Sequence, residues 1–240
     1  MEQKAYITYL CNDNFIPGAI ALVKSGKYFE TQEPFVCMIT EDVSKEGRKA
    51  LLEAGYSDLP VVDKIIPTRT AGIEDRYKGN SWMMYTKLNL WNLTQYEKLA
   101  FLDADCLIVS PELNMLDMPA VSAVKDIGYG GISAGVLVLE PNEEIYKDML
   151  SEINSTEYDN TYSDQSFLDW YLKKNEMWNE IPIHYNALQK RIQLTHELKV
   201  YHYNGQKPWI TDQSNSCHWQ QGDNREYLAW MHFYNLGEEE

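Results

Sequence analysis

The sequence predicts an α/β protein: a single domain in which helices cover a mostly parallel central sheet. Strand-like and helix-like segments alternate in the order β-α-β-α-β over the first 68 residues, the pattern of a parallel sheet. The 240 residues suffice for one such domain with a sizeable core, and the 44% hydrophobic and 24% charged fractions are those of a globular protein. Since no repeat or low-complexity linker divides the chain, we expect one domain over residues 1–240.

The first half of the chain supplies most of the expected sheet. β-branched and aromatic residues predict strands over residues 4–12, 34–40 and 60–68. A helix is expected to begin between Asn14 and Pro17 and to end near Gly26. A second helix should run between a Ser44 cap and a Gly55 stop. Residues 69–80 are polar and are expected to form an exposed loop.

The second half mixes further strands with amphipathic helices. Apolar residues at helical spacing predict a helix over residues 81–93. Strands are expected at 97–109, 122–128, 133–141 and 199–204, and helices at 142–154, 163–175 and from 224 onward. Four aromatic residues near the end fit either a sugar-stacking platform or core packing: Tyr201, Tyr203, Trp209 and Trp219.

Charge and targeting features narrow the partners. Asp and Glu outnumber Lys and Arg by 36 to 21, and the resulting net charge of −15 disfavours nucleic acid and anionic membranes as partners. The four cysteines lack metal-binding spacing and are interpreted as reduced structural residues. The N-terminus lacks the features of a signal peptide, and no apolar run approaches the roughly 18 residues of a membrane span. We therefore expect a soluble, cytoplasmic protein.

Two carboxylates interrupt the apolar run AFLDADCLIV. Asp103 and Asp105 would follow a strand, at the carboxyl end where open α/β sheets bind ligands. In extended chain they would point to the same side and repel each other unless a cation lay between them. A hard ion such as Mn²⁺ or Mg²⁺ suits oxygen ligands and could in turn hold a diphosphate. A D-x-D sequence alone is also common by chance in an acidic chain, so a solvated acidic pair is the alternative.

A second polar stretch, HYNGQKPW, begins where a late strand is expected to end. His202 is a candidate third metal ligand, although a lone histidine is also often a hydrogen-bonded structural residue. Gly205 would let the backbone approach a ligand closely, and Lys207 could neutralise phosphate charge.

With these stretches, six segments in order resemble glycosyltransferase family 8, the family of glycogenin. They are AYITYLCNDNFIPGAIAL, YTKLNLWNLTQYEKLAFLDADCLIV, SAGVLVLEP, SDQSFL, IPIHYNAL and HYNGQKPW. The resemblance covers residues from about 5 to about 210. It implies a GT-A (Rossmann-like) fold with a nucleotide-binding part at about 1–110 and a sugar- and acceptor-binding part at about 111–240.

The resemblance also implies an activity and its residues. We expect transfer of a hexose, with retention, from a UDP-sugar (UDP-glucose or UDP-galactose) to a hydroxyl of a separate carbohydrate or glycoconjugate, with Mn²⁺, or alternatively Mg²⁺, as cofactor. The implied metal ligands are Asp103, Asp105 and His202. The implied catalytic residues are Asp164, Gln165 and Lys87. The implied donor contacts are Thr8, Asn12, Phe15, Lys87, Leu102, Asp103, Ala104, Asp105, Ser133, Ala134, Gly205 and Lys207.

Several positions depart from the family pattern. Phe15 replaces a usual Tyr, Ser133 replaces an Asn that contacts the sugar, and Thr161 replaces a common carboxylate. No clean match to a donor-clamping Arg occurs, and Arg76 or Lys78 could take that place. Residues 187–198 contain no tyrosine, so we expect no self-glucosylation like that of glycogenin.

Two other functions stay open at this point. A sugar nucleotidyltransferase would share the fold, but YLCNDNFIPG lacks the Gly-rich basic loop usual there. A nucleotide-sugar-binding module without turnover is the other alternative, although Asp103, Asp105, His202 and Lys207 are all present. Family relatives are often dimers, which leaves a homodimer open as well.

Overall fold

A computed structural model describes residues 3–75, 79–126, 128, 130–188, 197–205, 207–210 and 225–237 of the chain. The strands are β1 (Gln3–Leu10), β2 (Phe35–Ile39), β3 (Tyr96–Leu102), β4 (Cys106–Ile108), β5 (Ser122–Lys125), β6 (Ile132–Leu139), β7 (Asn179–Ile181), β8 (Ala187–Leu188) and β9 (Val200–His202). The α-helices are α1 (Ile16–Tyr28), α2 (Lys45–Ala54), α4 (Ser81–Tyr85), α5 (Glu143–Glu152), α6 (Asp164–Lys174) and α7 (Arg225–Tyr234). The 3-10 helices are η1 (Asp13–Phe15), η2 (Thr86–Asn92), η3 (Met115–Asp117) and η4 (Ile183–Tyr185).

A six-stranded sheet in the order β2-β1-β3-β6-β5-β7 forms the centre of the molecule. β1 pairs in parallel with both β2 and β3, and β5 pairs in parallel with β7. β6 runs antiparallel to its neighbours β3 and β5, so it alone opposes the direction of the other strands of this sheet. The prediction of a mostly parallel central sheet is therefore confirmed.

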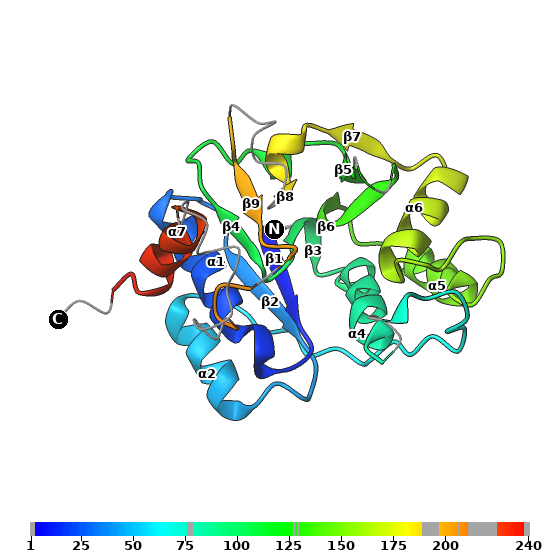
Figure 1. Ribbon diagram of the computed structural model, residues 1–240, viewed down its shortest axis with the longest axis horizontal. Helices are drawn as coiled ribbons and strands as arrows, with labels where there is room; N and C mark the ends of the chain where they lie inside the picture. Colours follow the sequence, from blue (N-terminus) through cyan, green and yellow to red (C-terminus); the bar gives the residue numbers. More distant parts are fainter. Residues whose placement is uncertain are drawn as a thin grey trace.

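Helices cover both faces of the sheet (Figure 1). Alternate residues of β1 enter two different cores, because side chains of a strand point to opposite faces. Ala5 and Ile7 pack in a cluster with Phe167 of α6, whereas Tyr6 packs in a cluster with Leu22 of α1. In Figure 1, α1, α2 and α7 lie on one side of the sheet, and α4, α5 and α6 lie on the other.

A second, three-stranded sheet in the order β4-β9-β8 lies next to the first. β9 pairs antiparallel to β4, with His202 opposite Cys106, and in parallel with β8. A third apolar cluster joins this sheet to α1 and α7 and includes Leu107, Tyr201 and Trp230. Tyr201 and Tyr203 are almost fully buried in it, so core packing is the role that the structure gives them.

One expected strand is wrong. Residues 60–68 form no continuous strand: Val61 forms an isolated bridge with Ile39 of β2, and Asp58, before this segment, forms another with Val36. Pro60 and Pro67 have no amide hydrogen to donate to a strand ladder, which limits regular pairing here. Ile65 nevertheless reaches the core at 7% exposure, whereas Ile66 is 67% exposed.

Other segments follow the sequence with local differences. The expected strand 97–109 divides into β3 and β4, which belong to different sheets. The expected helix 81–93 is a short α-helix, α4, continued by the 3-10 helix η2. Ser44 accepts a hydrogen bond from the Gly47 amide at the start of α2, and Gly55 ends that helix at a φ of 120°, as expected. No helix in the described parts of the chain is long and apolar enough to span a membrane.

Candidate functional site

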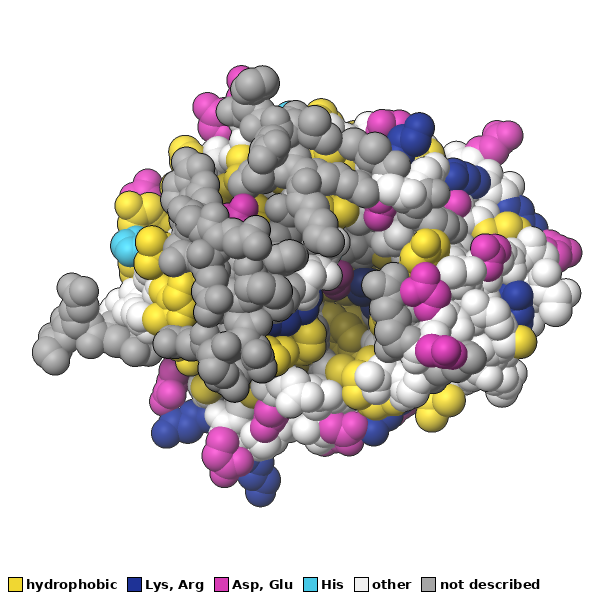
Figure 2. Space-filling view, in the orientation of Figure 1, with side chains coloured by type: hydrophobic (Ala, Val, Ile, Leu, Met, Phe, Trp, Pro, Cys, Tyr) yellow, Lys and Arg dark blue, Asp and Glu magenta, His cyan; other side chains and the backbone are white. Residues whose placement is uncertain are grey.

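A cavity of about 440 Å³ lies where β1 and β3 end. Figure 2 shows this face of the molecule hollowed near its centre, with basic and hydrophobic side chains on the floor of the hollow. Most of the residues expected from the sequence line it: Asn12, Phe15, Lys87, Asp103, Ala104, Asp105, Ala134, Asp164, Gln165, His202 and Lys207. Elements from both halves of the chain therefore meet at one site.

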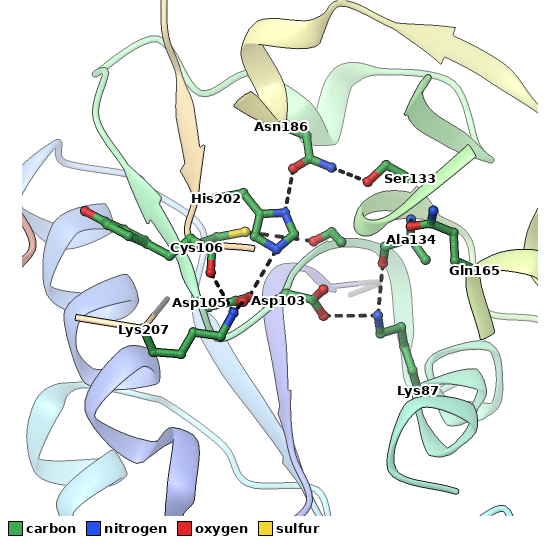
Figure 3. Close-up of polar contacts among 12 residues, drawn as sticks. Lys87, Asp103, Asp105, Cys106, Ser133, Ala134, Gln165, Asn186, His202 and Lys207 are labelled. Carbon is green, nitrogen blue, oxygen red and sulfur yellow. Dashed lines mark hydrogen bonds and ion pairs between the residues drawn. The ribbon is translucent and has the colours of Figure 1, made fainter. Parts of the chain in front are cut away.

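Lys87 forms the centre of the first polar group in the cavity. Its ammonium lies 3.1 Å from Asp103 Oδ1 and 3.2 Å from Asp164 Oδ2, and it donates a hydrogen bond of 3.1 Å to the Ala134 carbonyl. Lys87 and Asp164 have only 8% and 6% of their side chains exposed. Since Lys87 comes from η2, Asp103 follows β3 and Asp164 begins α6, one buried cation connects three elements. Figure 3 shows its contacts with Asp103 and with the Ala134 carbonyl.

The charges of this group depend on one another. Burial lowers the pKa of Lys87, but Asp103 and Asp164 outweigh it and raise the pKa above its ordinary value. Burial raises the pKa of Asp103, and Lys87 partly offsets that rise. The ammonium is thus firmly charged at neutral pH, because its loss would leave two neighbouring carboxylates without a counter-ion.

Asp105 forms a second polar group on the far side of the same turn. Residues 103–106 form a tight turn closed by a hydrogen bond from the Cys106 amide to the Asp103 carbonyl. Asp105 Oδ1 lies 3.3 Å from His202 Nε2, and Lys207 donates to Asp105 Oδ2 at 2.5 Å. Burial opposes ionisation of Asp105, but His202 and Lys207 together hold its pKa well below the usual range. The two aspartates are not in extended chain, and each has its own set of partners.

The donor set fits a divalent cation. Carboxylate oxygens and an imidazole nitrogen are ligands that Mn²⁺ accepts. Two ligands at about 2.1 Å and at right angles on an octahedral ion stand about 3 Å apart, close to the 3.3 Å between Asp105 Oδ1 and His202 Nε2. Asp103 also faces this point, since a Cβ built on Gly135 would lie 2.4 Å from His202 Cε1 and 3.1 Å from Asp103 Oδ2.

Cys106 offers a third metal-ligating atom beside Asp105 and His202, with all three ligand atoms within 4.8 Å of one another. Its side chain, however, packs in the apolar core with Leu102 and Val136. Burial also raises the pKa of its thiol well above the usual value. The structure thus places Cys106 in the core beneath the site.

His202 has a further polar contact that points away from the cavity. Its Nδ1 lies 2.8 Å from Asn186 Oδ1, and Asn186 Nδ2 donates to Ser133 Oγ at 2.9 Å (Figure 3). All three residues are buried. The Ser133 hydroxyl is therefore already hydrogen bonded within the protein, and Ser133 is not among the residues that line the cavity.

The segment 207–210 packs against the residues at the start of α1, next to the cavity. Trp209 donates its indole N–H to the Asn14 carbonyl at 2.9 Å, and its ring meets Phe15 edge to face with centroids 5.6 Å apart. A Cβ on Gly18 would lie 2.3 Å from the Ala104 carbonyl oxygen and 2.5 Å from the Trp209 ring. Only glycine allows α1 to approach the turn 103–106 and Trp209 this closely.

The family model described as "Glycosyl transferase family 8" matches residues 6–213, which include all of these groups. The chain belongs to glycosyltransferase family 8. Glycogenin-1 of Caenorhabditis elegans is 32% identical over 181 residues, which are 75% of this chain and 41% of that protein. UDP-glucuronate:xylan alpha-glucuronosyltransferase 1 of Arabidopsis thaliana is 30% identical over 236 residues, covering 90% of this chain and 34% of the relative. This family-8 chain thus spans less than half of the length of either relative.

A solved structure shows the same fold. That of the galactosyltransferase LgtC, in complex with donor and acceptor sugar analogs, superposes with a TM-score of 0.68 at 16% identity and covers 96% of this chain and 95% of that one. The expected GT-A fold is thereby confirmed.

Four expected donor contacts of the family-8 site lie outside the cavity lining: Thr8, Leu102, Ser133 and Gly205. Thr8 and Leu102 are buried in β1 and β3. Arg76, Lys78 and Trp219, named from the sequence, lie outside the described residues. Other lining residues have no site role predicted from the sequence: Tyr9, Leu10, Cys11, Asn80, Gly135, Tyr162 and Asn204. For Met83 and Met84, the helical spacing leaves open a place beside the donor or in the core, and both residues line the cavity.

Proposed function

We propose that this protein transfers a neutral hexose from a UDP-sugar, with retention of anomeric configuration and with Mn²⁺ bound, to a hydroxyl of a separate carbohydrate or glycoconjugate. One observation carries the proposal: the Lys87 group and the Asp105 group face the same cavity in a chain of glycosyltransferase family 8. Mg²⁺ is the alternative cation.

The Asp105 group would stabilise the leaving diphosphate. Breaking a sugar–phosphate bond develops negative charge on the leaving oxygens, and fixed positive charge at that place lowers the barrier. Asp105, His202 and Asp103 would hold the cation, which supplies Lewis acidity toward the diphosphate. Lys207, 2.5 Å from Asp105 Oδ2, would exchange that partner for a phosphate oxygen when the donor binds.

The Lys87 group would serve the sugar. Asp164 and Gln165 begin α6 at the cavity, and Gln165 Oε1 accepts a hydrogen bond from the Ala134 amide at 3.3 Å. Their oxygens could stabilise positive charge at the anomeric carbon of an oxocarbenium-like transition state. Lys87 holds the Asp164 carboxylate in position for that purpose.

The charge balance of the cavity favours a neutral sugar. Among the described residues that line the cavity, the carboxylates of Asp103, Asp105 and Asp164 face the ammonium groups of Lys87 and Lys207. Lys87 is already paired with Asp103 and Asp164, and Lys207 and the bound cation would face the diphosphate. A sugar carboxylate would find no free cation among these residues and would be repelled by Asp164, whereas hexose hydroxyls can donate to Asp164.

The experiment is UDP release from UDP-glucose, UDP-galactose and UDP-glucuronate, each with Mn²⁺, Mg²⁺ or EDTA. The expected result is slow release from a neutral UDP-hexose that needs Mn²⁺ and that an oligosaccharide acceptor accelerates. Release from UDP-glucuronate in preference to both hexoses would overturn the sugar assignment. Release that continues in EDTA would overturn the metal assignment. A protein that fails to bind UDP by calorimetry, with or without Mn²⁺, would overturn the donor assignment.

A further inference from the structure

The contacts behind His202 point to a positioning role that the cavity itself does not reveal. Three buried side chains form a chain of hydrogen bonds from Ser133 on β6, through Asn186, to His202 at the end of β9. Their exposed fractions are 4%, 1% and 6%. We name Ser133, Asn186 and His202 the histidine relay.

We propose that Ser133 and Asn186 fix the His202 ring with its Nδ1–H group donating to Asn186, so that Nε2 is the ring nitrogen that faces Asp105 and that a cation in the cavity would bind. This inference rests on the proposed function only for its consequence, namely cation binding. The assignment of the tautomer itself concerns the protein alone.

The distances favour a hydrogen bond in which His202 Nδ1–H donates to Asn186 Oδ1. Nδ1 lies 2.8 Å from Asn186 Oδ1, within the preferred range for N–H···O, whereas Nε2 lies 3.3 Å from Asp105 Oδ1, beyond it. Since Asn186 directs its NH₂ group to Ser133 Oγ at 2.9 Å, its amide oxygen faces the ring and can only accept. Nδ1 is therefore the nitrogen that donates to Asn186, and Nε2 is the nitrogen turned toward Asp105 and the cavity.

The ring is also fixed on its face. A Cβ built on Gly135 would lie 2.4 Å from His202 Cε1 and 2.8 Å from Nδ1, so the ring packs directly on the backbone of β6. β8 pairs in parallel with β9, with Leu188 opposite His202, and this pairing brings Asn186, just before β8, next to the ring. Both sheets thus contribute to one orientation of the imidazole.

The relay gives Ser133 a role different from a sugar contact. Its hydroxyl accepts from Asn186, and Ser133 is not among the described residues that line the cavity. Outer partners that orient a ligating histidine typically change metal affinity 10- to 100-fold when they are removed. We expect Asn186 to carry most of that effect, because it hydrogen bonds with the ring, and Ser133 to carry a smaller part, because its hydrogen bond is with Asn186.

The first test reads the tautomer without any metal. The protein, with ¹⁵N-labelled histidine and no added cation, is examined by long-range ¹H–¹⁵N correlation NMR, with His202→Gln to assign the signal. Protonation on Nδ1 is expected. A ring protonated on Nε2 and not on Nδ1 would overturn the proposal, and because no cation or donor is present, that outcome is independent of the proposed function.

The second test measures Mn²⁺ binding in the presence of UDP, by loss of the free-ion EPR signal. Asn186→Ala should weaken Mn²⁺ roughly 10- to 100-fold and Ser133→Ala a few-fold. Asn186→Asp keeps an acceptor for Nδ1–H and should restore most of the affinity. Tyr185→Phe is the matched control: it removes the neighbouring hydrogen bond to Asn114 Oδ1 and leaves the relay intact.

Unchanged Mn²⁺ affinity in Asn186→Ala would overturn the relay, as would equal losses in Asn186→Ala and Tyr185→Phe. Should Asn186→Ala not fold, Asn186→Asp and Ser133→Ala still decide: a loss of affinity in Asn186→Asp as large as that of His202→Gln would refute the acceptor role. A wild-type protein that binds UDP but no Mn²⁺ would overturn the cation part of the proposed function, and the tautomer alone would then decide the relay.

Discussion

Replacing Lys87 by methionine tests whether its ammonium is the counter-ion of two buried carboxylates. Methionine keeps much of the length of the side chain and removes the charge. Asp103 and Asp164 would then share one site with no cation between them, at distances of 3.1 and 3.2 Å from the place where the ammonium was. The Ala134 carbonyl would lose its donor as well.

The size of the effect follows from these distances. At an effective dielectric constant near 20, each contact contributes about 5 kcal/mol of Coulomb attraction. The cost of burying the ions, several kcal/mol each, cancels much of that sum. Removing one partner of such a group leaves a buried charge uncompensated, which typically costs 3–5 kcal/mol. Because 29% of the Asp103 side chain is exposed, we expect the lower half of that range, about 3–4 kcal/mol.

The assay is urea unfolding at pH 8 with the free energy of unfolding as the readout. Lys49→Met is the control, since Lys49 pairs with Glu53 on the surface and its loss should cost about 0.5 kcal/mol or less. The double variant Lys87→Met/Asp164→Asn should recover about 1–2 kcal/mol of the loss, because it removes one of the two orphaned charges. A loss below about 1 kcal/mol in Lys87→Met would show that the ammonium is not a buried counter-ion.

The pH dependence gives an independent check. A lysine whose pKa is raised by folding contributes its full stability below its ordinary pKa of about 10.4, so this contribution is constant between pH 5 and 8. The pKa of Asp103 is raised by burial and held back by Lys87, so removing Lys87 raises it further. A carboxyl with a raised pKa is stabilised by protonation, and the deficit of Lys87→Met should shrink as the pH falls from 8 to 5. A deficit that stays constant over that range would refute the coupling.

Three further variants test the Asp105 group in the cavity. Asp105→Asn should keep the fold and abolish Mn²⁺-dependent UDP binding by calorimetry; unchanged affinity would remove Asp105 from the metal site. Gly135→Ala places a Cβ 2.4 Å from His202 Cε1 and should displace the ring, weakening Mn²⁺ at least 10-fold by EPR; wild-type affinity would mean that the ring is free to move. Lys207→Ala should lower kcat clearly and should lower thermal stability only slightly. A fully active variant would refute the proposed contact of Lys207 with the diphosphate.

The fold was predictable wherever local pattern and tertiary packing agree. The alternation in residues 1–59 predicts β1, α1, β2 and α2, because each has caps or periodicity that act locally. Residues 60–68 have the composition of a strand, but prolines interrupt them, and Val61 forms only an isolated bridge to β2. Strands were expected over β4 and β9, but their pairing with β8 in a second sheet was not predictable, because these strands are two or three residues long and pair only in the tertiary structure.

The candidate site was likewise predictable only in part. Asp103, Asp105 and His202 could be named from sequence, because acids in an apolar run and a histidine at a strand end are visible as exceptions. Asn186 could not: nothing in IPIHYNAL indicates that its amide meets the ring of His202, 16 residues later in the chain. The pairing of β8 with β9 creates that contact, and such pairing depends on tertiary structure.

The turn between β3 and β4 explains why the two aspartates have different partners. β3 belongs to the central sheet and β4 to the second sheet, so the chain must change direction between Leu102 and Cys106. Asp103 lies at the end of the central sheet and pairs with Lys87, whereas Asp105 lies at the start of the second sheet and contacts His202. A cation between them would be held by both sheets at once. We therefore expect that Mn²⁺ binding, besides screening the repulsion of the two acids, stabilises the packing of one sheet against the other.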